Sequence, residues 1–335
     1  MYALIFSMVV AFLTTFFITP YFIKFLRLAR IVSIDLHKRN KPVLPSSGGI
    51  CVAFGVLAGL LVFMGLQTFI QGVKTNASLL AVISSILIVT FVGLIDDINV
   101  KSKKVKTKDG MNVKIGIPQW IKPLITLPAA IPLMVISAGE TTMAIPFIGE
   151  VDFNIFYPLV LIPIGVVGAS NAINLLGGFN GSEAGMGVVY MFALGIYGLL
   201  HGSIGSVIFL ISFASLLAFL KYNWYPAKIL PGDSLTYLLG SLLATGVIVG
   251  NMEKIGVIVI LPFIIEFFLK ARAKFKATCL GKLRRDGKLA PPYGKKIYSL
   301  THILMNLKPL TEKQVTILLI LIEIVFSSIP FLGFI

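Results

Sequence analysis

Long uninterrupted runs of apolar residues dominate the pattern along the chain. A helix needs about 20 apolar residues to cross a bilayer, and runs close to that length recur over residues 3–24, 48–66, 79–95, 121–138, 155–176, 184–200, 204–220, 234–250, 255–269 and 315–334. None of them alternates apolar and polar positions as a membrane-spanning β-strand does. The pattern predicts an all-α integral membrane protein with about ten transmembrane helices, folded as a single membrane domain over residues 1–335.

The composition agrees with a membrane protein and excludes an ordinary soluble domain. Of the 335 residues, 57% are hydrophobic and 13% are charged, and the mean hydropathy is +0.94. The first apolar run has no basic residue before it and is longer than the core of a signal peptide, so we expect it to be a span itself. Cys51 and Cys279 are too few for a disulfide framework and have no metal-ligand spacing, which predicts two free thiols.

Basic residues are distributed unevenly between the two sets of loops. Of the 29 lysines and arginines, 27 fall in or beside the loops that follow odd-numbered spans, and only Lys74 and Lys254 fall on the other side. Because loops rich in basic residues stay in the cytoplasm, we expect these loops inside and both termini outside, in a multi-pass protein of the cell membrane. The formal charge of +15 then reflects topology, and we expect no nucleic-acid partner.

Two loops carry a pattern of their own. The longest, residues 270–314, is predicted to be cytoplasmic, and its apolar residues at spacings of 3, 4 and 3 would share one face of a helix: Ile297, Leu300, Leu304 and Leu307. Such a helix would lie along the membrane surface or pack against the bundle. Residues 141–148 and 150–153 are rich in β-forming residues, so we expect a short hairpin there on the outer side.

Polar residues gather in four clusters, and the predicted topology places all four at the cytoplasmic face. The first comprises residues 35–39, Asp-Leu-His-Lys-Arg, and residues 45–49, Pro-Ser-Ser-Gly-Gly, where backbone N–H groups in a turn can bind an anion. The second is the pair Asp96 and Asp97 at the end of a span. Adjacent carboxylates there are costly unless a metal, a lysine or a proton balances them. A solvated helix end is the alternative.

The third and fourth clusters contain oxygen donors beside glycines. Asn171 and Asn174 share one face of a helix, and residues 177–183, Gly-Gly-Phe-Asn-Gly-Ser-Glu, follow them. The asparagine oxygens can serve Mg²⁺, or the side chains can bond a neighbouring helix. Asp233 follows Gly232, which permits close approach of a phosphate or metal. The alternative for Asp233 is a simple helix N-cap.

Three other polar residues lie outside the four clusters. Glu266 and Glu323 lie within predicted spans but have no motif beside them, which favours structural hydrogen bonding. His201 falls on the predicted outer side, away from the four clusters. We therefore expect no chemistry from these residues.

Taken in chain order, the clusters resemble the motifs of the polyprenyl-phosphate N-acetylhexosamine-1-phosphate transferases, a family with ten spans. The resemblance covers nearly the whole chain and rests on Asp-Leu-His-Lys at 35–38, Gly-Leu-Ile-Asp-Asp at 93–97, Asn-Ala-Ile-Asn at 171–174, Gly-Phe-Asn-Gly-Ser-Glu-Ala-Gly at 178–185 and Gly-Asp-Ser at 232–234. The asparagines of the third motif look closest to the eukaryotic dolichyl-phosphate GlcNAc-1-phosphate transferases. The last cytoplasmic loop has only His302 in place of the bacterial histidine triplet, and the longer eukaryotic insertion is missing, as would fit an archaeal enzyme.

The resemblance implies a role for each matched residue. Asn174 and Asp233 would hold Mg²⁺, with Mn²⁺ as an alternative ion. The implied catalytic residues are Asp96, Asp97 and Lys122, with Lys106 as a rival for the lysine. The implied substrate contacts are Asp35, Lys38, Asn171, Asn180 and Glu183, and Arg284 and Arg285 are the candidates for the diphosphate in the last cytoplasmic loop.

The implied reaction transfers GlcNAc-1-phosphate from UDP-GlcNAc to a polyprenyl or dolichyl phosphate in the membrane and releases UMP, as the first step of lipid-linked oligosaccharide synthesis for N-glycosylation. Such a transfer needs charge neutralisation and in-line positioning more than covalent help. The acceptor phosphate, with a second pKa of about 6, is largely dianionic at neutral pH and needs little help from a base. Asp96 and Asp97 would then position a substrate or the metal, and a two-step route through an aspartyl intermediate stays open.

Other functions are kept as alternatives. The same chemistry with another UDP-N-acetylhexosamine would serve cell-wall or surface-polymer synthesis. A transporter is disfavoured because transport sites lie near the bilayer midplane at repeat interfaces, whereas the clusters here gather at one surface and no repeat is visible. A non-catalytic lipid-binding scaffold would have no use for both an acid pair and an isolated aspartate on one face. A homodimer is left open.

Overall fold

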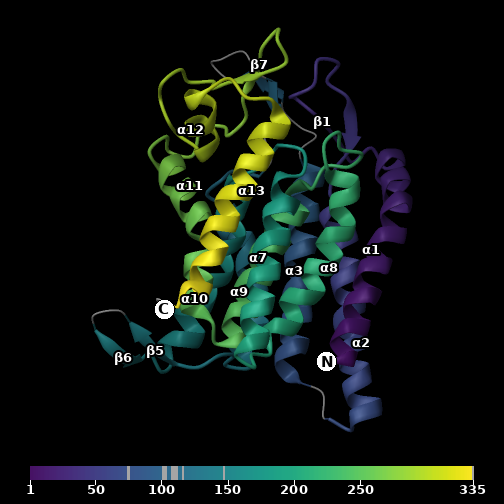
Figure 1. The fold of residues 1–335 in the computed structure, drawn as a ribbon, viewed down its shortest axis with the longest axis vertical. Coiled ribbons are helices and arrows are strands. Elements are labelled where there is room, and N and C mark those ends of the chain that lie inside the picture. Colours follow the sequence, from purple (N-terminus) through teal and green to yellow (C-terminus); the bar gives the residue numbers. More distant parts are fainter. Residues whose placement is uncertain (74–75, 100–103, 107–111, 115–116, 146–147, 334–335) are drawn as a thin grey trace.

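The computed structural model describes residues 1–73, 76–99, 104–106, 112–114, 117–145 and 148–333. Its helices form an elongated bundle (Figure 1). Within the described residues, 8 helices are long and apolar enough to cross a membrane. They are α1 (Tyr2–Leu28), α2 (Gly49–Gln71), α3 (Ala77–Asn99), η2 (Tyr157–Leu161) continuing into α6 (Ile162–Leu175), α7 (Ser182–Leu200), α8 (Gly205–Asn223), α9 (Gly232–Gly250), and α13 (Glu312–Ser328) continuing into η3 (Ile329–Leu332). The predicted all-α membrane fold is confirmed.

The two other predicted spans form broken helices. Residues 121–138 give α4 (Lys122–Thr126), η1 (Leu127–Ala130) and α5 (Ile131–Val135), each with a proline in its first turn. Residues 255–269 fall in α10 (Glu253–Val259) and α11 (Leu261–Ala271). The break between these two helices comes just before Pro262. A proline cannot donate the helical hydrogen bond and crowds the preceding turn. Because each piece is shorter than a span requires, the count of ten spans stays a prediction.

Helix α9 lies in the middle of the bundle and is buried along nearly its whole length, with α3 and α6 packed against it. Small residues allow these close contacts, as in other membrane bundles. A side-chain carbon at Gly240 would collide with the backbone of Ser170 on α6, and one at Gly93 on α3 would lie 2.5 Å from the Cα of Ser234. A side-chain carbon at Gly49, at the start of α2, would collide with the carbonyl carbon of Ser234. The ends of α2, α3 and α9 therefore meet at one point.

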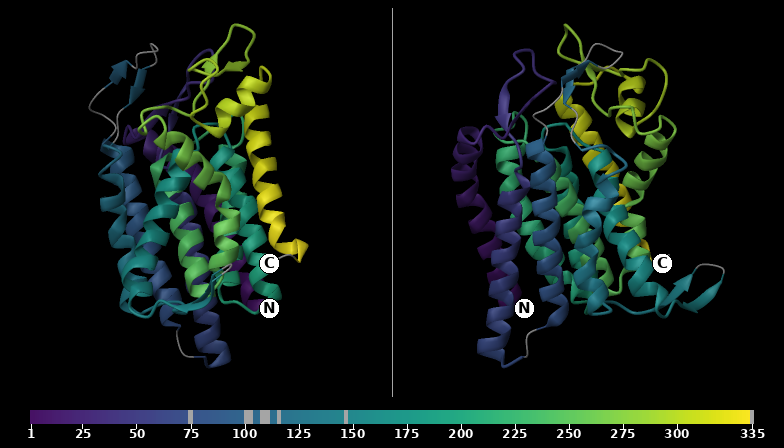
Figure 2. Two further views of the ribbon diagram at one scale, coloured as in Figure 1. Left: turned by 90° about the vertical axis from the view of Figure 1, so that its left-hand side faces the viewer. Right: turned by 180° about the vertical axis from the view of Figure 1, so that it is seen from behind.

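The loops divide between the two ends of the bundle. Both termini lie toward one end, together with the antiparallel hairpin of β5 (Thr142–Ile145) and β6 (Gly149–Asp152), so the predicted hairpin is confirmed (Figures 1 and 2). The opposite end carries three further two-stranded sheets. These are β1 (Val32–Ile34) with β2 (Val43–Pro45), β3 (Lys104–Lys106) with β4 (Asn112–Lys114), and β7 (Lys282–Leu283) with β8 (Leu289–Ala290). The loops predicted to be cytoplasmic thus share one end.

The segment 270–314 folds over that loop-rich end. Its helix α12 (Leu300–Leu307) packs against α11 and α13, with Leu300 and Leu304 buried and Leu307 exposed. Glu266 on α11 accepts hydrogen bonds from Ser299 Oγ at 3.0 Å and from the backbone N–H of Leu300 at 2.8 Å. The structural role predicted for Glu266 is therefore confirmed, and an interfacial location for α12 stays a prediction.

Candidate active site

A cavity of about 440 Å³ opens at the loop-rich end of the bundle, where α3, α4, α6 and α9 begin or end. Every one of the four polar clusters found in the sequence contributes to its wall. Among its lining residues are Asp35, Ser46, Asp97, Lys122, Asn174, Gly178, Asn180, Glu183, Asp233, Thr236 and Cys279. The fold therefore brings together residues that are up to about 240 positions apart in the chain.

Asp97 holds the first turn of α9. Its Oδ1 accepts a hydrogen bond from the backbone N–H of Asp233 at 2.8 Å, and its Oδ2 accepts from the N–H of Ser234 at 3.2 Å. The Ser47 hydroxyl donates to the same Oδ2 at 2.6 Å. A helix start leaves backbone N–H groups without partners inside the helix, and here α3 supplies the missing acceptor. Asp233 is thus not the N-cap of α9, since its own N–H is capped by Asp97.

Asp96 and Lys122 form a buried ion pair beside the cavity. The Lys122 ammonium lies 2.8 Å from Asp96 Oδ2 and 3.0 Å from Asp233 Oδ2, so it bridges the two carboxylates. Asp96 also accepts hydrogen bonds from the Tyr237 hydroxyl at 3.0 Å and from the backbone N–H of Ile117 at 3.0 Å. Asp96 is fully buried, so a solvated helix end is excluded and the lysine partner is confirmed. The side chain of the rival, Lys106, lies outside the described residues.

Asn174 and Asp233 are in direct contact in the cavity wall. With its amide turned to suit its neighbours, Asn174 donates to Asp233 Oδ1 and to Thr236 Oγ1, both at 2.8 Å, and its oxygen accepts from Lys122 at 3.2 Å. Turning the amide back would present the oxygen beside the Asp233 carboxylate, because the two orientations occupy the same space. Two oxygen ligands, one charged, then face one side of the cavity.

The described residues contain no cluster of three or more His, Cys, Asp or Glu side chains placed to hold a metal. This is compatible with Mg²⁺, which is commonly held by one or two carboxylates together with substrate phosphates and waters. The cavity wall also carries four carboxyl groups, those of Asp35, Asp97, Glu183 and Asp233, against one basic side chain, Lys122, among its described lining residues. The residues present therefore fit a divalent cation.

Asn171 and Glu183 support the site in different ways. The Asn171 amide donates to Thr126 Oγ1 at 3.0 Å and to the Val167 carbonyl at 2.8 Å, so it joins α6 to α4 and does not line the cavity. Glu183 lines the cavity and accepts hydrogen bonds from the backbone N–H of Gly178 at 2.7 Å and from Ser182 Oγ at 2.5 Å. Its carboxylate therefore shapes the glycine-rich turn between α6 and α7.

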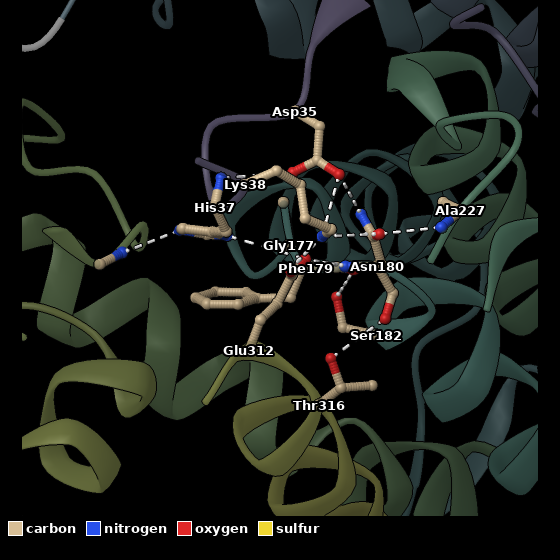
Figure 3. Close-up of polar contacts among 12 residues, drawn as sticks. Asp35, His37, Lys38, Gly177, Phe179, Asn180, Ser182, Ala227, Glu312 and Thr316 are labelled. Atoms are coloured by element: carbon tan, nitrogen blue, oxygen red, sulfur yellow. Dashed lines mark hydrogen bonds and ion pairs between the residues drawn. The ribbon is translucent and has the colours of Figure 1, made fainter. Parts of the chain in front are cut away.

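Asp35, Lys38 and Asn180 form one polar network with a residue that the sequence did not single out, Glu312 (Figure 3). Lys38 Nζ lies 3.0 Å from both Asp35 Oδ2 and Asn180 Oδ1, and it pairs with Glu312 Oε2. The Asn180 amide also donates to Asp35 Oδ2 at 3.2 Å. Asp35 and Asn180 line the cavity, so this network forms one of its walls.

Arg284 and Arg285 lie away from the cavity wall. Arg284 is about half exposed, with its Nε 3.7 Å from the carboxylate of Asp286, and the Arg285 carbonyl accepts from the Arg39 guanidinium at 2.6 Å. The segment 278–280 lines the cavity instead. Burial raises the pKa of the Cys279 thiol, which donates to the Gly177 carbonyl at 2.9 Å. Cys279 is thus a free thiol that packs in the cavity wall, and no motif in the sequence indicates a role for this segment.

Comparison with known proteins agrees with this geometry. The profile of glycosyl transferase family 4 matches residues 79–251. A protein of Saccharolobus solfataricus is 34% identical over 330 residues, which cover 98% of this chain and 95% of that protein. The chain belongs to glycosyl transferase family 4. The Saccharolobus protein carries the provisional name UDP-N-acetylglucosamine–dolichyl-phosphate N-acetylglucosaminephosphotransferase.

Two further members give the same picture. A Sulfolobus acidocaldarius protein with the same provisional name is 32% identical over 96% of this chain and 93% of its own length. The UDP-N-acetylglucosamine–dolichyl-phosphate N-acetylglucosaminephosphotransferase of Dictyostelium discoideum is 27% identical over 90% of this chain and 81% of its own length. The family 4 region contains Asp96, Asp97, Lys122, Asn174 and Asp233. The wall formed by Asp35, Lys38 and Glu312 lies outside it.

Proposed function

We propose that this family 4 member transfers GlcNAc-1-phosphate from UDP-GlcNAc to a polyprenyl or dolichyl phosphate, giving polyprenyl-diphospho-GlcNAc and UMP. The observation that carries the proposal is the meeting of Asn174, Asp233 and Lys122 in one cavity at the end of a membrane bundle. The names of the three relatives support the same substrates. By this account the chain catalyses the first step of lipid-linked oligosaccharide synthesis.

The reaction requires two phosphate groups to meet. An oxygen of the acceptor phosphate forms a bond to the phosphorus that carries the sugar, and the bond between that phosphorus and the bridging oxygen of UDP breaks, so that UMP leaves with the electron pair. A soluble donor and a lipid acceptor meet most directly at the membrane surface, where the cavity lies at the end of the bundle. Lys122 supplies a positive charge there, with its orientation fixed by Asp96.

We assign positioning roles to the two adjacent aspartates. Asp96 is held by Lys122, Tyr237 and the N–H of Ile117, and both Asp97 oxygens accept hydrogen bonds at the start of α9. Carboxylates held in this way orient other groups more readily than they attack phosphorus or remove a proton. A direct transfer therefore fits the geometry better than a covalent aspartyl intermediate.

We propose that Asn174 and Asp233 hold Mg²⁺ during turnover, with Mn²⁺ as a substitute. When bound, the ion would neutralise the charge of the donor diphosphate. The protein's own part is to fix the two ligands: Thr236 Oγ1 contacts Asn174, and Asp97 holds the backbone of Asp233. The excess of carboxyl groups over basic side chains among the described lining residues also supports a cation in this position.

We further propose that the loop-rich end of the bundle faces the cytoplasm, with both termini outside and ten membrane passages in all. The distribution of 27 basic residues against 2 supports this orientation. The test is a single cysteine at position 150 in a variant without Cys51 and Cys279. A membrane-impermeant maleimide should label it from outside intact cells, and labelling only from the cytoplasmic side would overturn the proposed orientation.

The donor is tested with purified protein, polyprenyl phosphate and a panel of UDP-sugars, scored by the lipid product. UDP-GlcNAc should react faster than UDP-GalNAc and UDP-MurNAc-pentapeptide. If another UDP-N-acetylhexosamine reacted much faster, the proposed sugar would be wrong while the transfer chemistry would stand. That outcome would favour synthesis of a cell-wall or surface polymer.

A further inference from the structure

The first turn of α13 reaches across the loop-rich end and holds the backbone of Asn180 at two points. Glu312 Oε1 accepts a hydrogen bond from the Asn180 N–H at 2.9 Å, and Thr316 Oγ1 donates to the Asn180 carbonyl at 3.1 Å (Figure 3). Glu312 and Thr316 are four residues apart, so they share one face of the helix. Both are buried, and both lie outside the region matched by the family.

The side chain of Asn180 is held as firmly as its backbone. Its Oδ1 accepts from Lys38 Nζ at 3.0 Å and from the N–H of Ala227 at 2.9 Å. Its Nδ2 donates one hydrogen to Asp35 Oδ2 at 3.2 Å. The second Nδ2 hydrogen has no partner among the described residues, and Asn180 lines the cavity. A fixed, unused donor is what recognition of an uncharged acceptor group on a ligand requires.

Glu312 also lies beside His37, which contacts a second segment of the cavity wall. The His37 ring stacks on Phe179 with its centroid 4.6 Å away, and its Nδ1 lies 3.9 Å from Glu312 Oε1. On the other side, His37 Nε2 accepts a hydrogen bond from the backbone N–H of Gly281 at 3.2 Å. Gly281 follows the segment 278–280, which lines the cavity. Glu312 thus lies between the part of the wall formed by Asn180 and the part formed by residues 278–280.

The negative charge of Glu312 balances the positive charge of Lys38. It pairs with Lys38 while almost fully buried, and removing one partner of a buried ion pair leaves the other charge uncompensated. The helix itself does not depend on Glu312, because Thr311 and Gln314 form a complete capping box at its start. A change at Glu312 should therefore disturb Lys38 and Asn180 more than it disturbs α13.

We propose that Glu312 is a positioning residue for the nucleotide-sugar donor, acting by fixing Asn180 and Lys38 in the cavity wall. The inference rests on the proposed function, since it assigns that wall to the donor. The membrane-bound acceptor should be insensitive to Glu312, because a polyprenyl phosphate has no carbonyl or hydroxyl group to accept a hydrogen bond from the Asn180 amide.

The test compares Glu312→Gln, Glu312→Ala and the exposed neighbour Lys313→Ala as the matched control. We expect the KM for UDP-GlcNAc to rise at least about tenfold in Glu312→Ala and by a smaller factor in Glu312→Gln, whose amide oxygen can still accept from Asn180. The kcat and the KM for polyprenyl phosphate should stay within about threefold of wild type. Lys313→Ala should leave all three unchanged.

Binding of UDP-GlcNAc, measured by titration calorimetry, separates this inference from the proposed function. If wild type binds UDP-GlcNAc but releases no UMP, the proposed function fails. The dissociation constants of the variants for UDP-GlcNAc still test the positioning role of Glu312. An unchanged donor affinity in folded Glu312→Ala, or equal losses for donor and acceptor, would overturn the positioning role. Should Glu312→Ala fail to fold, Thr316→Val takes its place, with an expected loss of donor affinity of about threefold.

Discussion

Asp97 Oδ1 accepts a hydrogen bond from the backbone N–H of Asp233 at 2.8 Å, so the end of α3 caps the start of α9. The contact is possible because Gly93 on α3 and Gly49 on α2 let the backbone at Ser234 come close. Two acids that are 136 residues apart in the chain are thereby fixed in one arrangement. The position of Asp233 in the cavity is thus set by a neighbouring helix as well as by its own.

Replacing Asp97 should therefore damage the site through Asp233. In Asp97→Asn, the new NH₂ group would face the backbone N–H of either Asp233 or Ser234, so the first turn of α9 should shift. We expect kcat/KM to fall at least about thirtyfold, about 2 kcal/mol of barrier, together with a higher Mg²⁺ requirement. Asp286→Asn, in an exposed loop, is the matched control. Activity of Asp97→Asn within about threefold of wild type would contradict this role.

The two proposed metal ligands should behave alike. Asp233→Asn and Asn174→Ala should each lose Mg²⁺-dependent turnover while the folded protein is retained, because each removes an oxygen ligand from the ion. Turnover is measured against Mg²⁺ concentration, and folding by thermal unfolding in detergent. If either variant kept activity within about threefold of wild type at saturating Mg²⁺, the ligand assignment would be wrong; a tenfold loss corresponds to about 1.4 kcal/mol.

Lys122 allows a test that separates stability from activity. Lys122→Met leaves Asp96 as a buried, uncompensated charge, and we expect a loss of about 3 kcal/mol in the free energy of unfolding together with loss of turnover. The double variant Lys122→Met, Asp96→Asn removes the fully buried unpaired charge and leaves only the partly exposed Asp233 without its partner, so most of the lost stability should return. Turnover should not return, because the positive charge at the phosphates is still missing. Full recovery of activity in the double variant would show that Lys122 has no part in the chemistry.

His302 predicts a pH dependence of stability. Burial lowers the pKa of His302 to about 4, and its Nδ1 accepts a hydrogen bond from the backbone N–H of Tyr298 at 3.2 Å. In the unfolded chain the pKa is about 6.5, so the unfolded state binds more protons between these values. Neutral His302 therefore contributes to the free energy of unfolding above a pH of about 6.5, and this contribution is lost as the pH falls toward 4.

The measurement compares thermal unfolding of wild type and His302→Asn from pH 7.5 to 4.5, since Asn can still accept from Tyr298. Wild type should lose stability more steeply with acidification, by up to about 1.4 kcal/mol per pH unit within that window. Parallel curves for the two proteins would show that His302 does not titrate in this way.

Periodicity and hydropathy predicted most of the helices because lipid imposes a simple requirement on spanning segments. The breaks at Pro262 and among the prolines of α4, η1 and α5 could have been anticipated from the missing N–H groups. The four polar clusters were found because charges and amides stand out in an apolar chain. Their meeting in one cavity followed from the shared end of the bundle.

Other features depend on contacts between residues that are distant in the sequence, and no local sequence pattern indicates these contacts. Asn171 and Asn174 look equivalent in the sequence, yet Asn171 bonds Thr126 on α4 and Asn174 faces Asp233. Glu312 follows a helix cap like many surface acids, and only the placement of Asn180 and Lys38 shows that it is buried and paired. Arg284 and Arg285 are the basic pair that the resemblance indicates in the last cytoplasmic loop, whereas residues 278–280 of that loop form the wall.

We propose that this cavity is where a sugar phosphate is transferred onto a lipid phosphate. The test is UMP release by the purified protein in detergent. UDP-GlcNAc, polyprenyl phosphate and Mg²⁺ are supplied together, and each is then left out in turn. The Asp233→Asn variant is measured in parallel. We expect UMP and polyprenyl-diphospho-GlcNAc in equal amounts only when all three are present, and neither product from Asp233→Asn. UMP release without the lipid, or lipid product at the wild-type rate from Asp233→Asn, would contradict it.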